Sequence, residues 1–307
     1  MSKIIIGIHG LRNKPPKRIL KRWWKKSIRE GLQTIGRSRW FFRFKLVYWA
    51  DVFHPEPLNP KEKNPEHPLY IKAPYCPGEN RTQKKPNALR KKIRDVLEKQ
   101  IARIFLNKDM TIYFSGITDR VIRHYFEELD GYYSKIVYDK KGKPCPAKEV
   151  IRGKLARILQ KNRKKKIVLI AHSMGSIIAY DVLTQVASDI KIDTFVTVGS
   201  PLGIPVILGK IASENKTPRK NGKLTTPENV ANHWFNFSDL EDKVAMHYKL
   251  RDHYEENSHH VRVLDKIVYN NYEIKGEKNP HKSYGYLRTP ELAEVIDGFL
   301  RGNKNKG

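Results

Sequence analysis

A serine whose neighbours fit a catalytic turn lies in the segment AHSMG (171–175). The segment follows the G-x-S-x-G pattern of a nucleophile elbow, with alanine at the first small position. Such a turn holds the serine in a strained conformation between a strand and a helix, so the residues two before and two after it must be small. The pattern predicts that Ser173 is a nucleophile, and a structural turn or an inactive enzyme is the alternative.

A serine nucleophile needs two backbone N–H groups that hold the oxyanion of the tetrahedral intermediate. Met174, directly after the serine, supplies the first of them. The segment HGL (9–11) ends an apolar run and supplies the second, through the N–H of Leu11. We expect the ring of His9 to pack and steady this loop rather than to transfer protons.

With a nucleophile elbow, the acid follows the serine in the chain and lies in a loop after a late strand. Asp239, Glu241 and Asp242 stand at or just after the end of HWFNFSD (233–239). We favour Asp242 because it precedes a small apolar helix start, where a carboxylate can turn toward a histidine. Asp239 and Asp265 are the alternatives, and each of these acids could instead be a solvated surface carboxylate.

The candidate base is His281, which lies among turn residues in NPHKSYG (279–285), just before the last predicted helix. A neutral imidazole there would take the proton of Ser173 and later return it to the leaving group. His259 and His260 are the competing candidates. A solvated loop histidine without a catalytic role is the remaining possibility for His281.

Apolar runs and amphipathic segments indicate the elements that must position these residues. We predict strands over 3–10, 45–51, 110–114, 166–173, 194–201, 233–239 and 260–264. We predict helices over 17–32, 88–106, 118–133, 147–162 and 175–187, and a last helix that starts at Pro290 with Thr289 as its N-cap. The lysine-rich stretch 209–224 is expected to be a loop. This alternation predicts an α/β fold with a mostly parallel sheet that is covered on both faces.

Residues 52–90 differ in composition from the rest of the chain. They contain eight prolines and many charges and show no periodicity. A loop of this length is usually functional or disordered. We therefore treat 52–150 as an insertion or cap region within a single domain of residues 1–307, and we predict that it covers an apolar acyl pocket as a lid.

The composition narrows the class of protein. A chain of 307 residues that is 39% hydrophobic is too rich in core formers to be disordered. Its two cysteines, Cys76 and Cys145, allow one disulfide but exclude a disulfide scaffold or a four-cysteine zinc site. No apolar run approaches the roughly 20 residues of a membrane span, and we predict a cytoplasmic protein. No ligand spacing near His259 and His260 supports a metal site, and we predict no cofactor.

The formal net charge of +28 attracts polyanions. The positive residues are spread widely, although KKIR (91–94) and RKKK (163–166) are local clusters and segment 17–32 is a basic amphipathic helix. We expect this charge mainly to keep the surface solvated, with peripheral contact to an anionic membrane as the second interpretation. Nucleic acid is not favoured, because no zinc-finger spacing or RNP-like aromatic motif is present.

The sequence resembles the serine hydrolases of the α/β-hydrolase superfamily, above all its lipase- and esterase-like members. The resemblance rests on HGL (9–11), AHSMGS (171–176), GSPLG (199–203), FSDLEDKVA (237–245) and PHKSYGYL (280–287). It implies a three-layer fold, a triad of Ser173, His281 and Asp242, and an acyl-enzyme mechanism without a metal. Two departures are expected: the family's first strands are missing, with a long insertion after the second strand, and the acid and base are 39 residues apart.

These features predict a serine hydrolase that cleaves carboxylic esters, including small-molecule or lipid esters. Acyl transfer, in which an alcohol replaces water, would use the same residues, and the sequence does not separate the two reactions. A third interpretation is an inactive protein on a hydrolase fold that binds anionic membranes or nucleic acid. The presence of serine, aspartate and histidine in the expected order argues against it.

Overall fold

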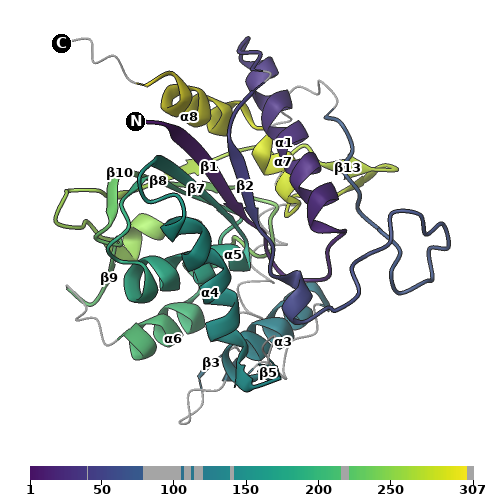
Figure 1. Cartoon of the computed structure of the whole chain (residues 1–307), viewed down its shortest axis with the longest axis horizontal. Coiled ribbons are helices and arrows are strands. Elements are labelled where there is room, and N and C mark those ends of the chain that lie inside the picture. Colours follow the sequence, from purple (N-terminus) through teal and green to yellow (C-terminus); the bar gives the residue numbers. More distant parts are fainter. Residues whose placement is uncertain are drawn as a thin grey trace.

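The computed structural model describes residues 1–39, 41–78, 105–106, 112–113, 120–138, 142–215 and 221–302. A six-stranded sheet forms its centre (Figure 1), and every pair of neighbouring strands in this sheet is parallel. The strand order is β12-β10-β8-β7-β1-β2. The bounds are β1 Lys3–Ile8, β2 Phe44–Val47, β7 Lys166–His172, β8 Ile192–Val198, β10 Val230–Ser238 and β12 Val263–Ile267.

Helices cover both faces of this sheet (Figure 1). The alternating side chains of β1 explain the two layers: Ile4, Ile6 and Ile8 are buried in one core, and Ile5 is buried in the other. The helices on the first face are α3 Arg120–Ser134, α4 Ala147–Gln160, α5 Met174–Asp181 and α6 Pro205–Asn215. The helices on the second face are α1 Lys17–Thr34, α7 Ser283–Leu287 and α8 Pro290–Arg301. The predicted three-layer α/β fold is therefore confirmed.

The two outer helices α1 and α8 follow their sequence patterns closely. In α1 the apolar residues spaced by four, Leu20, Trp24, Ile28 and Leu32, are all buried. Helix α8 begins at Pro290, and the Thr289 hydroxyl accepts a 3.4 Å hydrogen bond from the Leu292 amide.

The prediction of a loop over 209–224 was wrong in its first part, where α6 continues to Asn215. Ile207 and Ile211, four residues apart, are buried against the sheet, and Pro205 starts the helix. The apolar spacing favours a helix here in spite of the nearby lysines. One of these, Lys210, lies over the ring of Tyr133.

The remaining elements are short. Single-turn helices occupy Ala50–Val52 and Leu250–Asp252, and Val182–Val186 continues α5 as a π-type turn. Two-residue and three-residue strands form four small sheets: β3 Phe105–Leu106 with β4 Ile112–Tyr113, β5 Ile136–Tyr138 with β6 Pro144–Pro146, β9 Leu224–Thr225 with β11 Tyr254–Glu255, and β13 Glu273–Ile274 with β14 Glu277–Lys278. The strand predicted over 110–114 thus lies outside the central sheet, and most of the helix predicted over 88–106 lies outside the described residues.

Two further findings concern the cysteines and the helices. Cys76 and Cys145 are both free thiols. Among the described residues, no helix combines the length and the apolar character that crossing a bilayer requires.

The chain order changes direction between β1 and β7. From β1 the chain crosses to β2 at one edge, whereas from β7 it proceeds through β8 and β10 to β12 at the other. Loops at the carboxyl ends of strands diverge at such a switch point and leave a crevice that commonly binds ligands. The segments HGL (9–11) and AHSMG (171–175) both lie at this point, where β1 and β7 end.

Candidate active site

Ser173 lies on a tight turn between β7 and α5. Its backbone is in the left-handed region, with φ 55° and ψ −130°, which is uncommon for a residue other than glycine. Its amide donates a 3.0 Å hydrogen bond to the Val198 oxygen, which fixes the turn against β8. A Cβ atom on Gly175 would lie 2.8 Å from the Ile8 oxygen, so position 175 must be glycine for the turn to pack against β1.

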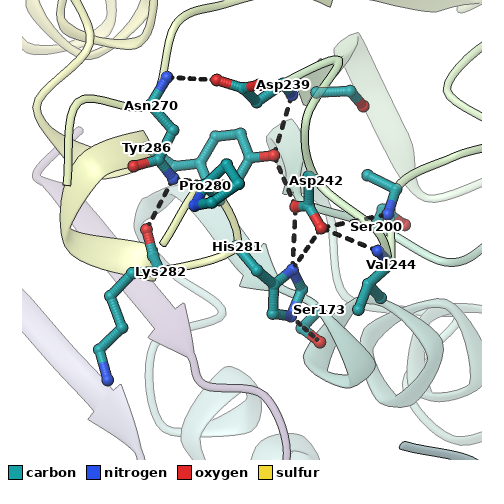
Figure 2. A network of polar contacts seen from close by, with 12 residues as sticks. Ser173, Ser200, Asp239, Asp242, Val244, Asn270, Pro280, His281, Lys282 and Tyr286 are labelled. Atoms are coloured by element: carbon teal, nitrogen blue, oxygen red, sulfur yellow. Dashed lines mark hydrogen bonds and ion pairs between the residues drawn. The ribbon is translucent and has the colours of Figure 1, made fainter. Parts of the chain in front are cut away.

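The structure brings Ser173, His281 and Asp242 together in one hydrogen-bonded chain (Figure 2). The Ser173 Oγ atom lies 2.9 Å from His281 Nε2. On the other side of the ring, His281 Nδ1 lies 2.9 Å from each carboxylate oxygen of Asp242. Ser173 and Asp242 are buried, whereas the His281 side chain is 27% exposed and faces the pocket described below.

The Asp242 carboxylate is held by groups other than the histidine. The Tyr286 hydroxyl donates a 2.7 Å hydrogen bond to Asp242 Oδ2, and the Val244 amide donates a 2.9 Å bond to Oδ1. Gly199, at the end of β8, has φ +55°, and a Cβ there would lie 2.8 Å from Asp242 Oδ2. The sequence motifs contain Tyr286 and Gly199, but nothing in their spacing showed that both would meet the acid.

The alternative acids lie elsewhere. Asp239 Oδ2 accepts a 2.7 Å hydrogen bond from the Asn270 amide, and its Oδ1 accepts one from the Glu241 amide. Burial raises the pKa of Asp239 to about 6. Asp265 accepts hydrogen bonds from Asn236 and from the Leu250 and Arg251 amides. Asp242 is the predicted acid that contacts His281, and the alternatives Asp239 and Asp265 do not.

The competing histidines His259 and His260 lie in different surroundings from His172. The exposed His260 lies 3.2 Å from a Glu256 oxygen, outside the pocket, and His259 also lies outside it. His172, by contrast, is buried beside His281, and its Nε2–H donates a 2.8 Å hydrogen bond to the His281 oxygen. Burial lowers the pKa of His172 well below its ordinary value, so the ring is neutral. The sequence predicts no role for His172, because only the fold shows its contact with the distant loop.

His9 takes the steadying role expected of it. Its Nδ1–H donates a 2.8 Å hydrogen bond to the Gly10 oxygen, and its Nε2 accepts a 3.1 Å bond from the Trp49 amide. The His9 ring stacks on the Trp49 indole with the centroids 5.1 Å apart. Burial lowers the pKa of His9 well below its ordinary value, which leaves the ring neutral. These contacts fix the loop that presents Leu11.

Leu11 and Met174, the two predicted oxyanion donors, both lie next to the turn that carries Ser173. Met174 is the first residue of α5, so its amide belongs to the unpaired first turn of the helix. Leu11 follows β1 and lines the pocket beside Ser173. A Cβ on Gly10 would lie 2.6 Å from the Ser173 Cβ atom, so the loop before Leu11 lies directly against the serine.

A pocket of about 570 Å³ opens beside Ser173 and His281. Its apolar lining includes Leu11, Leu240, Val244, Ala245, Met246 and Pro280. Its charged lining includes Arg12, Lys14, Glu128, Lys243, Lys278 and Lys282. A cavity of this size with an apolar wall can hold an acyl chain or a molecule of comparable size.

Comparison with known families adds one match. Residues 151–217 match the model of the family described as Lecithin:cholesterol acyltransferase. The matched segment contains most of α4, strands β7 and β8 and helices α5 and α6, and so includes Ser173 but neither Asp242 nor His281. Comparison with curated proteins gives no match. The parallel sheet, its two helical layers and this match together show that the chain has an α/β-hydrolase-like fold.

Proposed function

We propose that this protein is a serine hydrolase that cleaves carboxylic esters, with lipid esters as its favoured class. The observation that carries the proposal is the hydrogen-bonded chain from Ser173 through His281 to Asp242. A nucleophile, a base and an orienting acid in this order form the arrangement that activates a serine hydroxyl. The family match supports the lipid class, because the matched family is named for an acyltransferase that acts on a lipid ester.

The proposed reaction proceeds through an acyl-enzyme intermediate on Ser173. His281 Nε2 takes the proton of Ser173 Oγ as the oxygen attacks the ester carbonyl carbon. The amides of Leu11 and Met174 donate to the oxyanion, while the Asp242 carboxylate stabilises the imidazolium. His281 then returns the proton to the departing alcohol, and the acyl group remains on Ser173. Water repeats the sequence and releases the carboxylic acid.

Acyl transfer is the second candidate function. It differs only in the final acceptor, since an alcohol would take the acyl group from Ser173 in place of water. The match of residues 151–217 to an acyltransferase family favours it specifically. Product analysis with and without an added alcohol separates the two reactions.

We also propose that the described part of the predicted cap region 52–150 covers this pocket. Residues 79–104, 107–111, 114–119 and 139–141 of this region lie outside the described residues. Glu128, in α3, lines the pocket, and its carboxylate accepts a 2.7 Å hydrogen bond from the Arg12 amide beside the oxyanion loop. A contact between the cap region and this loop would let the cap influence which esters enter. Peripheral contact with an anionic membrane and a cytoplasmic location remain predictions of the sequence.

The test is turnover of p-nitrophenyl esters with acyl chains of two to twelve carbons. Wild-type protein is expected to hydrolyse them, and Ser173→Ala and His281→Gln should each reduce kcat by at least about a thousandfold. His260→Gln is the matched control, because His260 is exposed and lies outside the pocket. Equal activity in wild type and Ser173→Ala would contradict the proposal.

A further inference from the structure

The loop that carries His281 is held by a buried asparagine, Asn270. This residue follows β12, the edge strand of the central sheet. Its Nδ2 atom donates a 2.7 Å hydrogen bond to the Pro280 oxygen and a 2.9 Å bond to the Lys282 oxygen. These two main-chain oxygens stand directly before and after His281 in the chain. The Asn270 side chain therefore bridges the segment that presents the base (Figure 2).

A further contact of the Asn270 side chain fixes the direction of its carboxamide. The Oδ1 atom accepts a 3.1 Å hydrogen bond from the Tyr272 amide, so the NH2 group faces the two main-chain oxygens. An aspartate at this position would present an oxygen in place of the NH2 group, and this oxygen would repel both acceptors. A Cβ atom on Gly285, in α7, would overlap Asn270 Oδ1, so the glycine leaves the room that the carboxamide needs.

Three consecutive main-chain oxygens around the base accept hydrogen bonds from side chains. Asn270 donates to the first and the third of them, and His172 donates to the middle one, which belongs to His281 itself. The backbone that presents the imidazole is therefore held at its centre and on both sides.

Asn270 also contacts the loop that carries the acid. Its main-chain amide donates a 2.7 Å hydrogen bond to Asp239 Oδ2, and the Asp239 amide donates a 2.9 Å bond to the Tyr286 hydroxyl. The same hydroxyl donates to Asp242 Oδ2. Asn270 thus joins the loop of the acid to the loop of the base (Figure 2).

We infer that Asn270 is a positioning residue, which keeps the His281 imidazole within hydrogen-bond distance of Ser173 by holding the main chain on both sides of the base. This inference rests on the proposed ester hydrolase function and adds a residue to its machinery. Asn270 does not line the pocket, so it acts through the loop and not on the substrate. Its loss should therefore reduce kcat and leave KM nearly unchanged.

The first test measures hydrolysis of p-nitrophenyl butyrate by Asn270→Ala and Asn270→Asp proteins, with urea unfolding to show that each is folded. Asn270→Ala should lower kcat at least about tenfold and change KM less than about twofold, because it removes both donors to the loop. Asn270→Asp should lower kcat at least as much, although it keeps the shape of the side chain, and it carries the test if the alanine variant does not fold. A wild-type kcat in Asn270→Asp would mean that the side chain only fills space, and would overturn the inference.

Asn257 offers a matched control at the other end of the sheet. Its buried side chain likewise donates to two main-chain oxygens and accepts main-chain amides. One of these oxygens belongs to Val230, the first residue of β10, whereas Asp242 follows the end of that strand. Asn257→Ala should lose a similar free energy of unfolding in urea but keep the wild-type kcat. An equal loss of kcat in Asn257→Ala and Asn270→Ala would overturn the positioning role.

A proton NMR signal separates failure of the positioning role from failure of the proposed function. The proton between His281 Nδ1 and Asp242 should give a low-field resonance, assigned by its loss in His281→Gln protein. This resonance should broaden or vanish in Asn270→Ala and persist in Asn257→Ala. That result, without ester turnover by wild type, would keep the positioning role and reject the hydrolase. Turnover by wild type, with kcat and resonance both unchanged in Asn270→Ala, would keep the hydrolase and reject the positioning role.

Discussion

The imidazole of His172 and the main-chain oxygen of His281 are joined by a 2.8 Å hydrogen bond, which links the nucleophile turn to the loop that carries the base. The two rings lie 4.9 Å apart. The bond ties the position of His281 to that of Ser173, although 108 residues separate them in the chain. His172 is thus placed to act as a positioning residue, through the loop and not on the substrate.

Replacement of His172 by phenylalanine should lower kcat about fivefold with little change in KM. The ring volume is kept, but the donor to the His281 oxygen is lost, and one hydrogen bond is worth about 1 kcal/mol. Steady-state kinetics on a p-nitrophenyl ester measures the effect. His172→Gln, which retains a side-chain N–H, should recover part of kcat, and equal losses in both variants would mean that the hydrogen bond is not the cause.

Tyr286→Phe should lower kcat by about tenfold or more. The substitution removes the donor to Asp242 Oδ2, and a hydrogen bond to a charged group is worth about 1.5–3 kcal/mol. Tyr180→Phe is the matched control, because the buried Tyr180 hydroxyl donates to the Thr225 oxygen, far from the acid. The same loss of kcat in both variants would point to general destabilisation.

Asp239 should make the folded protein less stable as the pH rises from about 4 to 6. Its folded pKa of about 6 exceeds the ordinary value of 3.8, so in this range the folded state keeps a proton that the unfolded state has released. This carboxyl group is present in its stabilising, protonated form below pH 4, and its contribution is lost above pH 6. The pKa shift of Asp239 corresponds to about 3 kcal/mol of unfolding free energy.

Urea unfolding of wild type and Asp239→Asn at pH 4 and pH 7 measures this linkage. The wild-type free energy of unfolding should fall by about 3 kcal/mol more than that of the variant between these values. Parallel pH profiles for the two proteins would show that Asp239 has an ordinary pKa in the folded state.

A buried ion pair should contribute strongly to the packing of α3 and α4 on α5. Arg152 lies 3.0 Å from Asp181 Oδ2, which also accepts a 2.9 Å hydrogen bond from the Tyr132 hydroxyl. Arg152→Met should cost about 3–5 kcal/mol of unfolding free energy, because it leaves a buried carboxylate unpaired. Lys154→Met removes the more exposed pair with Asp51 and should cost about 0–1 kcal/mol. Similar costs in urea unfolding would contradict the prediction.

The sequence predicts most of the central sheet because strands such as KIVLIAH (166–172) are short apolar runs. Strand β12, VLDKI, is not such a run, and the predicted strand 260–264 overlaps it at only two residues. The sequence also places Ser173, His281 and Asp242 as candidates, since local turn patterns and chain order mark them. The contacts of Tyr286 and His172 could not be predicted in this way, because they depend on how loops distant in the chain meet above the sheet. The end of helix α6 was predicted as a loop because the stretch 209–224 is rich in lysine, although Ile207 and Ile211 are buried by the fold.

The most direct measurement is labelling with a fluorophosphonate probe, followed by mass spectrometry to locate the adduct. We expect one adduct, on Ser173, with labelling abolished in Ser173→Ala and strongly slowed in His281→Gln and Asp242→Asn but unchanged in His260→Gln. Labelling of another residue, or no labelling of folded wild-type protein with or without neutral detergent, would contradict an activated serine at the end of β7.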